Sequence, residues 1–145
     1  MIQTIYAEVP REKIEHLTRA EFINGTEKVG GQSFHDVLKA SMSKYGFKDP
    51  IYCSYGRGSY GDKIKVIVGN NRMVVAKELN IPIVPAVITN YKADEFPLEG
   101  RVLKTDDEIR ALFYLPKQIH VRRDKNGDID QVTPPNFQNV KQHYV

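Results

Sequence analysis

The sequence predicts an α+β fold, in which a small mixed sheet is flanked by helices, because two kinds of periodicity alternate along the chain. Runs rich in β-branched or aromatic residues occur at residues 50–55, 64–68 and 83–89. Amphipathic helical patterns stand before the first run and between the last two runs, and an Asn-Gly pair near the end separates two more short strands. We therefore expect a sheet with helices packed on it, extended at the C-terminal end by a helix and a β-hairpin.

The first elements are an expected strand at residues 4–9 and an expected helix at residues 11–19. Pro10 suits the first turn of a helix, and two apolar residues follow at a spacing of three. Residues 22–32 contain an Asn-Gly and a Gly-Gly dipeptide, which are typical of turns. We interpret this stretch as a loop.

The next helix has signals at both ends. Ser33 is a good N-cap, and Gly46 suits the position that follows the last helical turn. Apolar residues recur at helical spacing between them. The strands at residues 50–55 and 64–68 come next, and the Gly-rich connection between them predicts a hairpin.

A further helix starts directly after the strand at residues 64–68 and ends near Asn80. The strand at residues 83–89 contains Pro85, which favours a sheet edge or a bulge. Towards the end, Thr105 and Glu108 have the spacing of a capping box that opens a helix.

Two segments, 119–123 and 128–132, flank the Asn126-Gly127 pair, which predicts a β-hairpin.

Composition limits the classes of function. A chain of 145 residues that is 41% hydrophobic and 27% charged is ordinary for one globular domain, here residues 1–145. The net charge of +3 is spread evenly, so charge alone does not indicate nucleic-acid binding. The single cysteine allows no internal disulfide, and no segment has the roughly 20 apolar residues of a membrane span. We expect a cytoplasmic protein with no export signal and no membrane partner.

The junction between the strand at residues 64–68 and the next helix is the strongest candidate site. Its residues are Gly69, Asn70, Asn71 and Arg72. The first N–H groups of a helix lack partners and can hold an anion, and a guanidinium adds a fork of donors. Arg72 also shares a helical face with apolar residues, so it lies beside the buried stripe and needs a partner for its charge.

Two kinds of partner for Arg72 fit this spacing. One is a bound anion, such as the phosphate of a nucleotide or of DNA. The other is a protein carboxylate, such as that of Asp49 or Glu78, which would make Arg72 part of a structural ion pair. Gly69 has two interpretations as well: it lets a ligand approach the backbone, or it eases a tight strand-to-helix turn.

Residues 33–91 resemble the N-terminal domain of the ParB family, which shares its fold with sulfiredoxin. The matching features are the helix SFHDVLKASMSKYG, the strand DPIYCSY, the junction VGNNR and the segment AKELNIPIVPAVI. The resemblance defines a ParB-like core at about residues 33–91 and an extension at residues 92–145. In that family a Gly-x-x-Arg corner binds phosphates or nucleotides, which implies the same role for Gly69, Asn70, Asn71 and Arg72.

The resemblance also implies possible chemistry, from which this chain departs in several places. Partition ParB proteins bind and hydrolyse CTP, other members are described as nucleases, and sulfiredoxin binds ATP phosphates beside a cysteine. Here no cysteine lies between Gly69 and Arg72, and Asn70 and Asn71 stand where the family has a Glu and an Arg. We find no helix-turn-helix pattern after residue 92. Cys53 is interpreted as a small core residue.

Other residues are weaker candidates. Tyr55, Arg57 and Tyr60, around a Gly-rich loop, combine aromatic rings with a cation, which suits contacts to nucleic acid; an ordinary hairpin tip with solvated charges is the alternative. His35, Asp36 and Asp49 are the candidate catalytic residues, if the start of the helix that follows Ser33 faces the junction at Arg72. No His pair has metal-ligand spacing, so no metal site of the protein's own is predicted.

Two hypotheses result. In the first, the chain is a ParB-like domain that binds a nucleotide or DNA through phosphate, with Mg²⁺ as the ion that would accompany a nucleotide; any activity would be hydrolysis of a phosphate ester by a nuclease or nucleotidase. In the second, the chain is a non-catalytic protein-interaction module with Arg72 as a structural ion pair. The nucleotide, the oligomeric state and the biological source do not follow from the residues.

Overall fold

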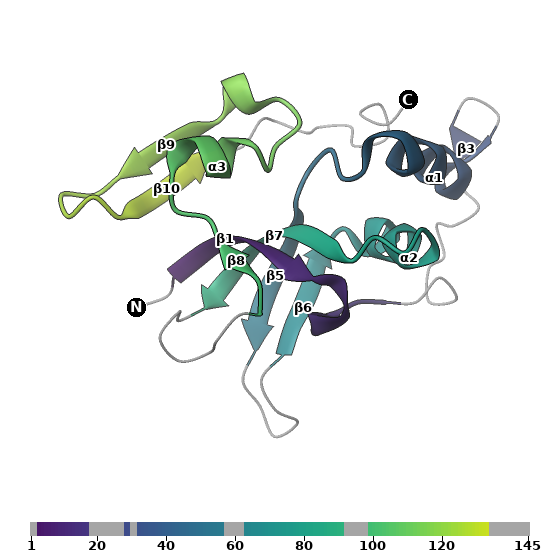
Figure 1. The fold of residues 1–145 in the computed structure, drawn as a ribbon, viewed down its shortest axis with the longest axis horizontal. Coiled ribbons are helices and arrows are strands. Elements are labelled where there is room, and N and C mark those ends of the chain that lie inside the picture. Colours follow the sequence, from purple (N-terminus) through teal and green to yellow (C-terminus); the bar gives the residue numbers. More distant parts are fainter. Residues whose placement is uncertain (1–2, 18–27, 30–31, 57–62, 92–98, 134–145) are drawn as a thin grey trace.

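The computed structural model describes residues 3–17, 28–29, 32–56, 63–91 and 99–133. Its centre is a six-stranded sheet made of β1 (Gln3–Pro10), β2 (Ile14–Glu15), β5 (Ile51–Gly56), β6 (Lys63–Val68), β7 (Ile83–Tyr91) and β8 (Arg101–Val102). The strand order is β2-β6-β5-β7-β1-β8 (Figure 1). Pairing is parallel between β5 and β7 and between β2 and β6, and antiparallel elsewhere. The α+β prediction and the mixed sheet are confirmed.

Two helices pack together beside this sheet. Helix α1 (Phe34–Tyr45) is capped by Ser33, whose hydroxyl accepts from the Asp36 N–H, and it ends at Gly46 with φ of +69°. Helix α2 (Asn70–Glu78) connects β6 to β7. The two helices share an apolar interface made by Phe34, Leu38, Met42, Val75 and Ala76. Since α2 also sends Met73 into the sheet core, it is buried between the sheet and α1.

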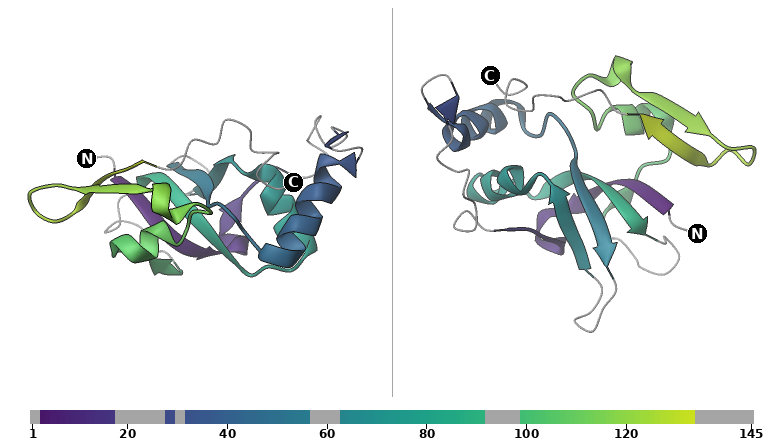
Figure 2. Two further views of the ribbon diagram at one scale, coloured as in Figure 1. Left: turned by 90° about the horizontal axis from the view of Figure 1, so that it is seen from above. Right: turned by 180° about the vertical axis from the view of Figure 1, so that it is seen from behind.

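The strands bury alternate residues on the two faces of the sheet, as a period of two requires. On β1, Ile5, Ala7 and Val9 face the core shared with α2, whereas Tyr6 belongs to a second apolar cluster. That second cluster is completed by residues of the C-terminal extension: Leu103, Ile109, Leu112, Phe113 and Ile119. Figure 2 shows the extension and the α1–α2 pair in separate positions around the sheet.

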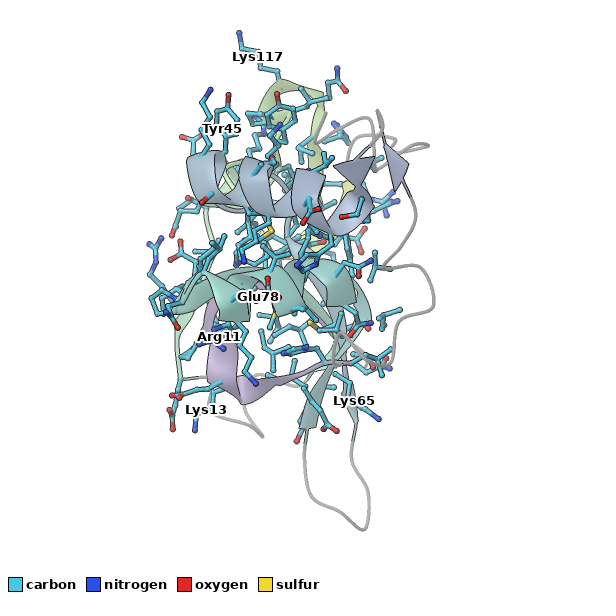
Figure 3. All side chains as sticks on the ribbon, turned by 90° about the vertical axis from the view of Figure 1, so that its right-hand side faces the viewer. Arg11, Lys13, Tyr45, Lys65, Glu78 and Lys117 are labelled. Carbon is cyan, nitrogen blue, oxygen red and sulfur yellow. The ribbon has the colours of Figure 1, made fainter. Side chains whose placement is uncertain are left out.

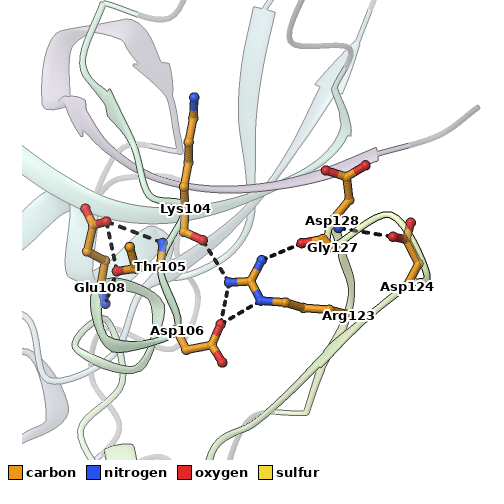
Figure 4. A network of polar contacts seen from close by, with 8 residues as sticks. All are labelled: Lys104, Thr105, Asp106, Glu108, Arg123, Asp124, Gly127 and Asp128. Carbon is orange, nitrogen blue, oxygen red and sulfur yellow. Dashed lines mark hydrogen bonds and ion pairs between the residues drawn. The ribbon is translucent and has the colours of Figure 1, made fainter.

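The C-terminal extension forms a helix and a hairpin, as predicted. Helix α3 (Asp106–Arg110) begins with the Thr105–Glu108 capping box, and strands β9 (His120–Arg123) and β10 (Ile129–Thr133) flank the Asn-Gly turn. Arg123 holds these parts together (Figure 4): its guanidinium contacts the Asp106 carboxylate and donates to the carbonyls of Lys104 and Gly127.

Short elements complete the described chain. They are two 3-10 helices, η1 (Arg11–Lys13) and η4 (Pro116–Gln118), and a small antiparallel pair of β3 (Lys28–Val29) with β4 (Gln32–Ser33). Most of the loop expected at residues 22–32 lies outside the described residues. No helix in the described part of the chain is both long and apolar enough to cross a membrane.

The helix expected at residues 11–19 is wrong over the residues that the structure describes. The chain makes only the single turn of η1 and then enters β2, where Ile14 pairs with Ile64 and is buried in the sheet core. Arg11 holds this path, because its N–H donates to the Pro82 carbonyl and its Nε to the Ile81 carbonyl. Tertiary pairing therefore overrides the local helical spacing.

The edge position expected for the strand that contains Pro85 is also wrong. β7 lies in the interior of the sheet, between β5 and β1. Pairing with β5 begins at Ala86, one residue after Pro85. Pro85 therefore lies opposite Glu8 in the β1–β7 ladder but outside the ladder with β5, so it has a paired strand on one side only.

Candidate functional site

Gly69 forms the turn from β6 into α2 and is the N-cap of the helix, with a left-handed φ of +116°. A Cβ added there would lie 2.7 Å from Ile51 Cγ2 and 3.0 Å from Arg72 Nη2. The space beside the glycine is thus filled by two side chains of the protein itself. Of the two interpretations of Gly69, this geometry supports the tight turn with close internal packing.

Arg72 lies in the first turn of α2 and is buried, with 6% of its surface exposed. Its Nη1 donates to the main-chain carbonyls of Asp49, at 2.8 Å, and Pro50, at 3.0 Å. Neither an anion nor a carboxylate was needed to accept these two bonds. Because carbonyl groups carry no net charge, these contacts satisfy the two N–H groups of Nη1 without balancing the charge of the guanidinium.

The two asparagines of the junction differ in their surroundings. Asn70 Oδ1 accepts a hydrogen bond from the Leu17 N–H at 2.8 Å, so this side chain fastens the end of the β2 segment to the start of α2. Asn71 is half-buried. The first turn of α2 contains no acidic residue, and its glycine cap has no side chain to accept from the first amides. The start of this helix therefore keeps the positive end of its dipole, and Arg72 adds its charge in the same first turn.

His35 does not face the Arg72 corner, which corrects the expectation for this residue. It is buried on α1, and its Nε2 lies 3.0 Å from Glu78 Oε2, at the opposite end of α2. Lys39 reaches the same carboxylate oxygen at 3.3 Å. Partial desolvation acts to raise the pKa of Glu78, but the hydrogen bonds and charges of Lys39 and His35 together lower it. These three side chains join the two helices.

The three speculative catalytic residues occupy different surroundings. Asp36 is exposed on the first turn of α1, whereas Asp49 is buried and its Oδ1 accepts from the Tyr114 N–H at 3.4 Å. Within the described ranges, no three His, Cys, Asp or Glu side chains come close enough together to hold a metal ion. The structure does not assemble His35, Asp36 and Asp49 into one catalytic group.

Tyr55, expected to contact nucleic acid, is instead a core residue. It is 5% exposed and packs in the main apolar cluster of the sheet, because it alternates with Ile51 and Cys53 on the inner face of β5. Arg57 and Tyr60, the other two residues of that prediction, lie outside the described residues.

Main-chain groups supply several contacts of the Gly69–Arg72 junction. Residue types in the sequence could not predict these contacts. The carbonyls of Asp49 and Pro50 receive Arg72, and the amide of Leu17 reaches Asn70. Every residue has such groups, so no residue type marks them in a sequence. Their role appears only when β5, β2 and α2 are placed together.

Cys53 is expected to be unreactive in the folded protein. Burial raises the pKa of its thiol to about 12, an effect that the charge of Arg72 opposes only in part, and the side chain has no exposed surface. We expect a thiol reagent such as Ellman's reagent at pH 8 to modify the native chain at least roughly 100-fold more slowly than the unfolded chain. The same reaction in denaturant is the control, and equal rates in both conditions would contradict the assignment.

Comparison with known proteins gives likeness at the level of structure. No protein-family model matches the chain, and no curated protein matches it. A solved structure of the C-terminally truncated chromosome-partitioning protein ParB from Caulobacter crescentus, complexed with CTP-γ-S, is similar, with a TM-score of 0.44 and 15% identity over 60% of this chain and 45% of that one.

Two further solved structures are similar. A Pnob8-like ParB-N domain has a TM-score of 0.43 and 13% identity over 77% of this chain and 37% of that one. Sulfiredoxin from Arabidopsis thaliana has a TM-score of 0.40 and 19% identity over 65% of this chain and 90% of that one. The chain spans less than half the length of the two ParB structures. These neighbours are of the ParB/sulfiredoxin kind named by the sequence resemblance, and the likeness concerns the fold alone.

Proposed function

We propose that this ParB-like domain binds a phosphate-bearing ligand, of the nucleotide class, over the first turn of α2. The observation that carries the proposal is the buried guanidinium of Arg72, whose described hydrogen bonds go to the uncharged carbonyls of Asp49 and Pro50. A positive charge in the first turn of a helix that has no side-chain cap attracts an anion to the amides of that turn.

The roles of the four junction residues follow from their positions. The amides of Asn70 and Asn71 and the side chain of Asn71 would donate to phosphate oxygens. Arg72 would act from below through its charge, and Gly69 would keep the guanidinium in place by leaving room for Nη2. This differs from direct clamping of the phosphate by an arginine fork, because Arg72 is 6% exposed and its Nη1 is already engaged.

A substitution at Asn71 tests ligand binding without disturbing the fold. Asn71→Asp places a carboxylate in the first turn of α2, which favours the helix but repels phosphate. We expect CTP or ATP with Mg²⁺, at about 100 times its dissociation constant, to stabilise the wild type by about 2.7 kcal/mol, which thermal unfolding reports as a rise in Tm. Asn71→Asp should abolish that rise.

Asn71→Ala is the matched control, since it removes the side-chain donor without adding a charge. It should keep part of the ligand-induced rise in Tm. If no nucleotide or inorganic phosphate raises the Tm of the wild type, with or without Mg²⁺, the ligand proposal is wrong.

The second candidate function is a protein-interaction module in which Arg72 is purely structural. The burial of Arg72 and its bonds to the start of β5 favour this alternative. It predicts the same Tm for the wild type with and without every nucleotide, and a stability loss on substitution of Arg72.

A further inference from the structure

Two exposed tyrosines lie at one end of the molecule, on separate elements. Tyr45 is the last residue of α1 and is 60% exposed; Tyr114 follows α3 and is 46% exposed. The ammonium of Lys48 lies between them, 5.0 Å from the centre of the Tyr45 ring and 4.7 Å from that of Tyr114. The shared cation places the two rings on one surface. Contiguous exposed apolar surface that is rimmed by polar groups is typical of contact sites.

The charged side chains of residues 40–48 and 111–118, which carry these rings, are all positive, whereas the neighbouring Asp49 is buried. Lys44 lies 5.0 Å from the Tyr45 ring, on which Lys48 also acts, and a hydrogen bond from Lys44 together with both charges lowers the pKa of Tyr45. Lys117 is exposed beyond Tyr114. Residues 40–48 and 111–118 contain these three lysines and no acidic residue. Figure 3 shows Tyr45 and Lys117 at the same end of the molecule.

The two halves of this surface are held to each other and to the fold. Asp49 Oδ1 accepts from the Tyr114 N–H, which fastens the segment after α3 to the connection between α1 and β5. Leu112 and Phe113, directly before Tyr114, are buried in the apolar cluster under the extension. The rings therefore stand on an ordered framework, so less conformational entropy is lost when a ligand binds.

We propose that the surface formed by Lys44, Tyr45, Lys48, Tyr114 and Lys117 binds single-stranded nucleic acid. Unpaired bases would stack on the two rings, while the lysines would contact phosphates, the combination that serves single strands without sequence preference. Duplex DNA hides its base faces within its own stack and gains nothing from the rings. An acidic peptide would use the lysines alone. The inference does not depend on the Gly69–Arg72 corner.

The first test measures binding of a fluorescein-labelled oligothymidylate by fluorescence anisotropy at low salt. Tyr45→Ala and Tyr114→Ala should each weaken binding by roughly 5-fold to 150-fold, the range for loss of one stacked base. Tyr45→Phe and Tyr114→Phe keep the ring and should bind like the wild type. Loss of binding in the Phe variants equal to that in the Ala variants would overturn the stacking role.

The second test separates phosphate contacts from bulk charge. Lys44→Gln and Lys117→Gln should each reduce the slope of log K against log salt by about 0.7, as for one phosphate contact on a single strand. Lys125→Gln, in the hairpin turn, removes the same charge away from the surface and should leave the slope unchanged. An equal effect of Lys125→Gln, no binding by the wild type, or equal competition by duplex DNA or by polyglutamate would each overturn the proposal.

Discussion

Gly69→Ala lowers the free energy of unfolding by about 2–6 kcal/mol. Two costs combine at this position. An alanine must adopt φ near +116°, which costs roughly 1–3 kcal/mol, and its methyl group must displace Ile51 Cγ2, which would lie 2.7 Å away, at roughly 1–3 kcal/mol for overpacking. Urea denaturation of the purified chain measures the sum.

Gly127→Ala is the matched control for the backbone term. Gly127 also has a positive φ, of +84°, but a Cβ there meets nothing within 4 Å. This variant should lose only about 1–2 kcal/mol, the cost of the left-handed conformation. If the two variants lose equal stability, the contacts of Gly69 with Ile51 and Arg72 have no energetic weight.

Arg72→Met is the second substitution with a large expected effect, a loss of about 2–4 kcal/mol. Methionine keeps much of the apolar volume but leaves the carbonyls of Asp49 and Pro50 without their charged donor in a buried place. Hydrogen bonds to charged groups contribute more than neutral ones, and orphaned buried acceptors add a desolvation cost. Chemical denaturation in the absence of any nucleotide measures this loss.

Arg122→Met controls for removal of an arginine as such. The Arg122–Asp130 pair is exposed on the hairpin, so its loss should cost less than about 1 kcal/mol. Arg72→Lys should fall between the wild type and Arg72→Met, since an ammonium can reach one carbonyl but lacks the planar fork. If Arg72→Met is as stable as the wild type within error, the hydrogen bonds of Arg72 to the Asp49 and Pro50 carbonyls do not stabilise the fold.

The elements that sequence reasoning placed correctly are those whose signals are local. Ser33 and Gly46 bound α1, Thr105 and Glu108 open α3, and Asn126-Gly127 makes the hairpin turn, all from residues a few positions apart. Where the outcome depended on a distant partner, the prediction was wrong. Ile14 joins a strand because Ile64 lies beside it, and β7 lies inside the sheet although Pro85 pairs with Glu8 of β1 alone.

The same distinction applies to the candidate site. The junction at Gly69–Arg72 was located from its strand-turn-helix pattern and from the buried spacing of Arg72, and the burial is confirmed. The sequence does not identify the partners of Arg72, which are the main-chain carbonyls of Asp49 and Pro50, because every residue type has such a carbonyl. The contact with nucleic acid predicted for Tyr55 is wrong, because Tyr55 alternates with Ile51 and Cys53 on the inner face of β5.

The cover that the C-terminal extension provides has a practical consequence for dissecting this chain. A fragment cut after Tyr91, at the end of β7, would lack α3 and both strands of the hairpin. Tyr6 and Val87, which pack against the extension in one apolar cluster with Leu103, Ile109 and Phe113, would then be exposed to solvent. We expect such a fragment to aggregate through this exposed apolar surface. Residues 99–133 therefore belong to any minimal folding unit.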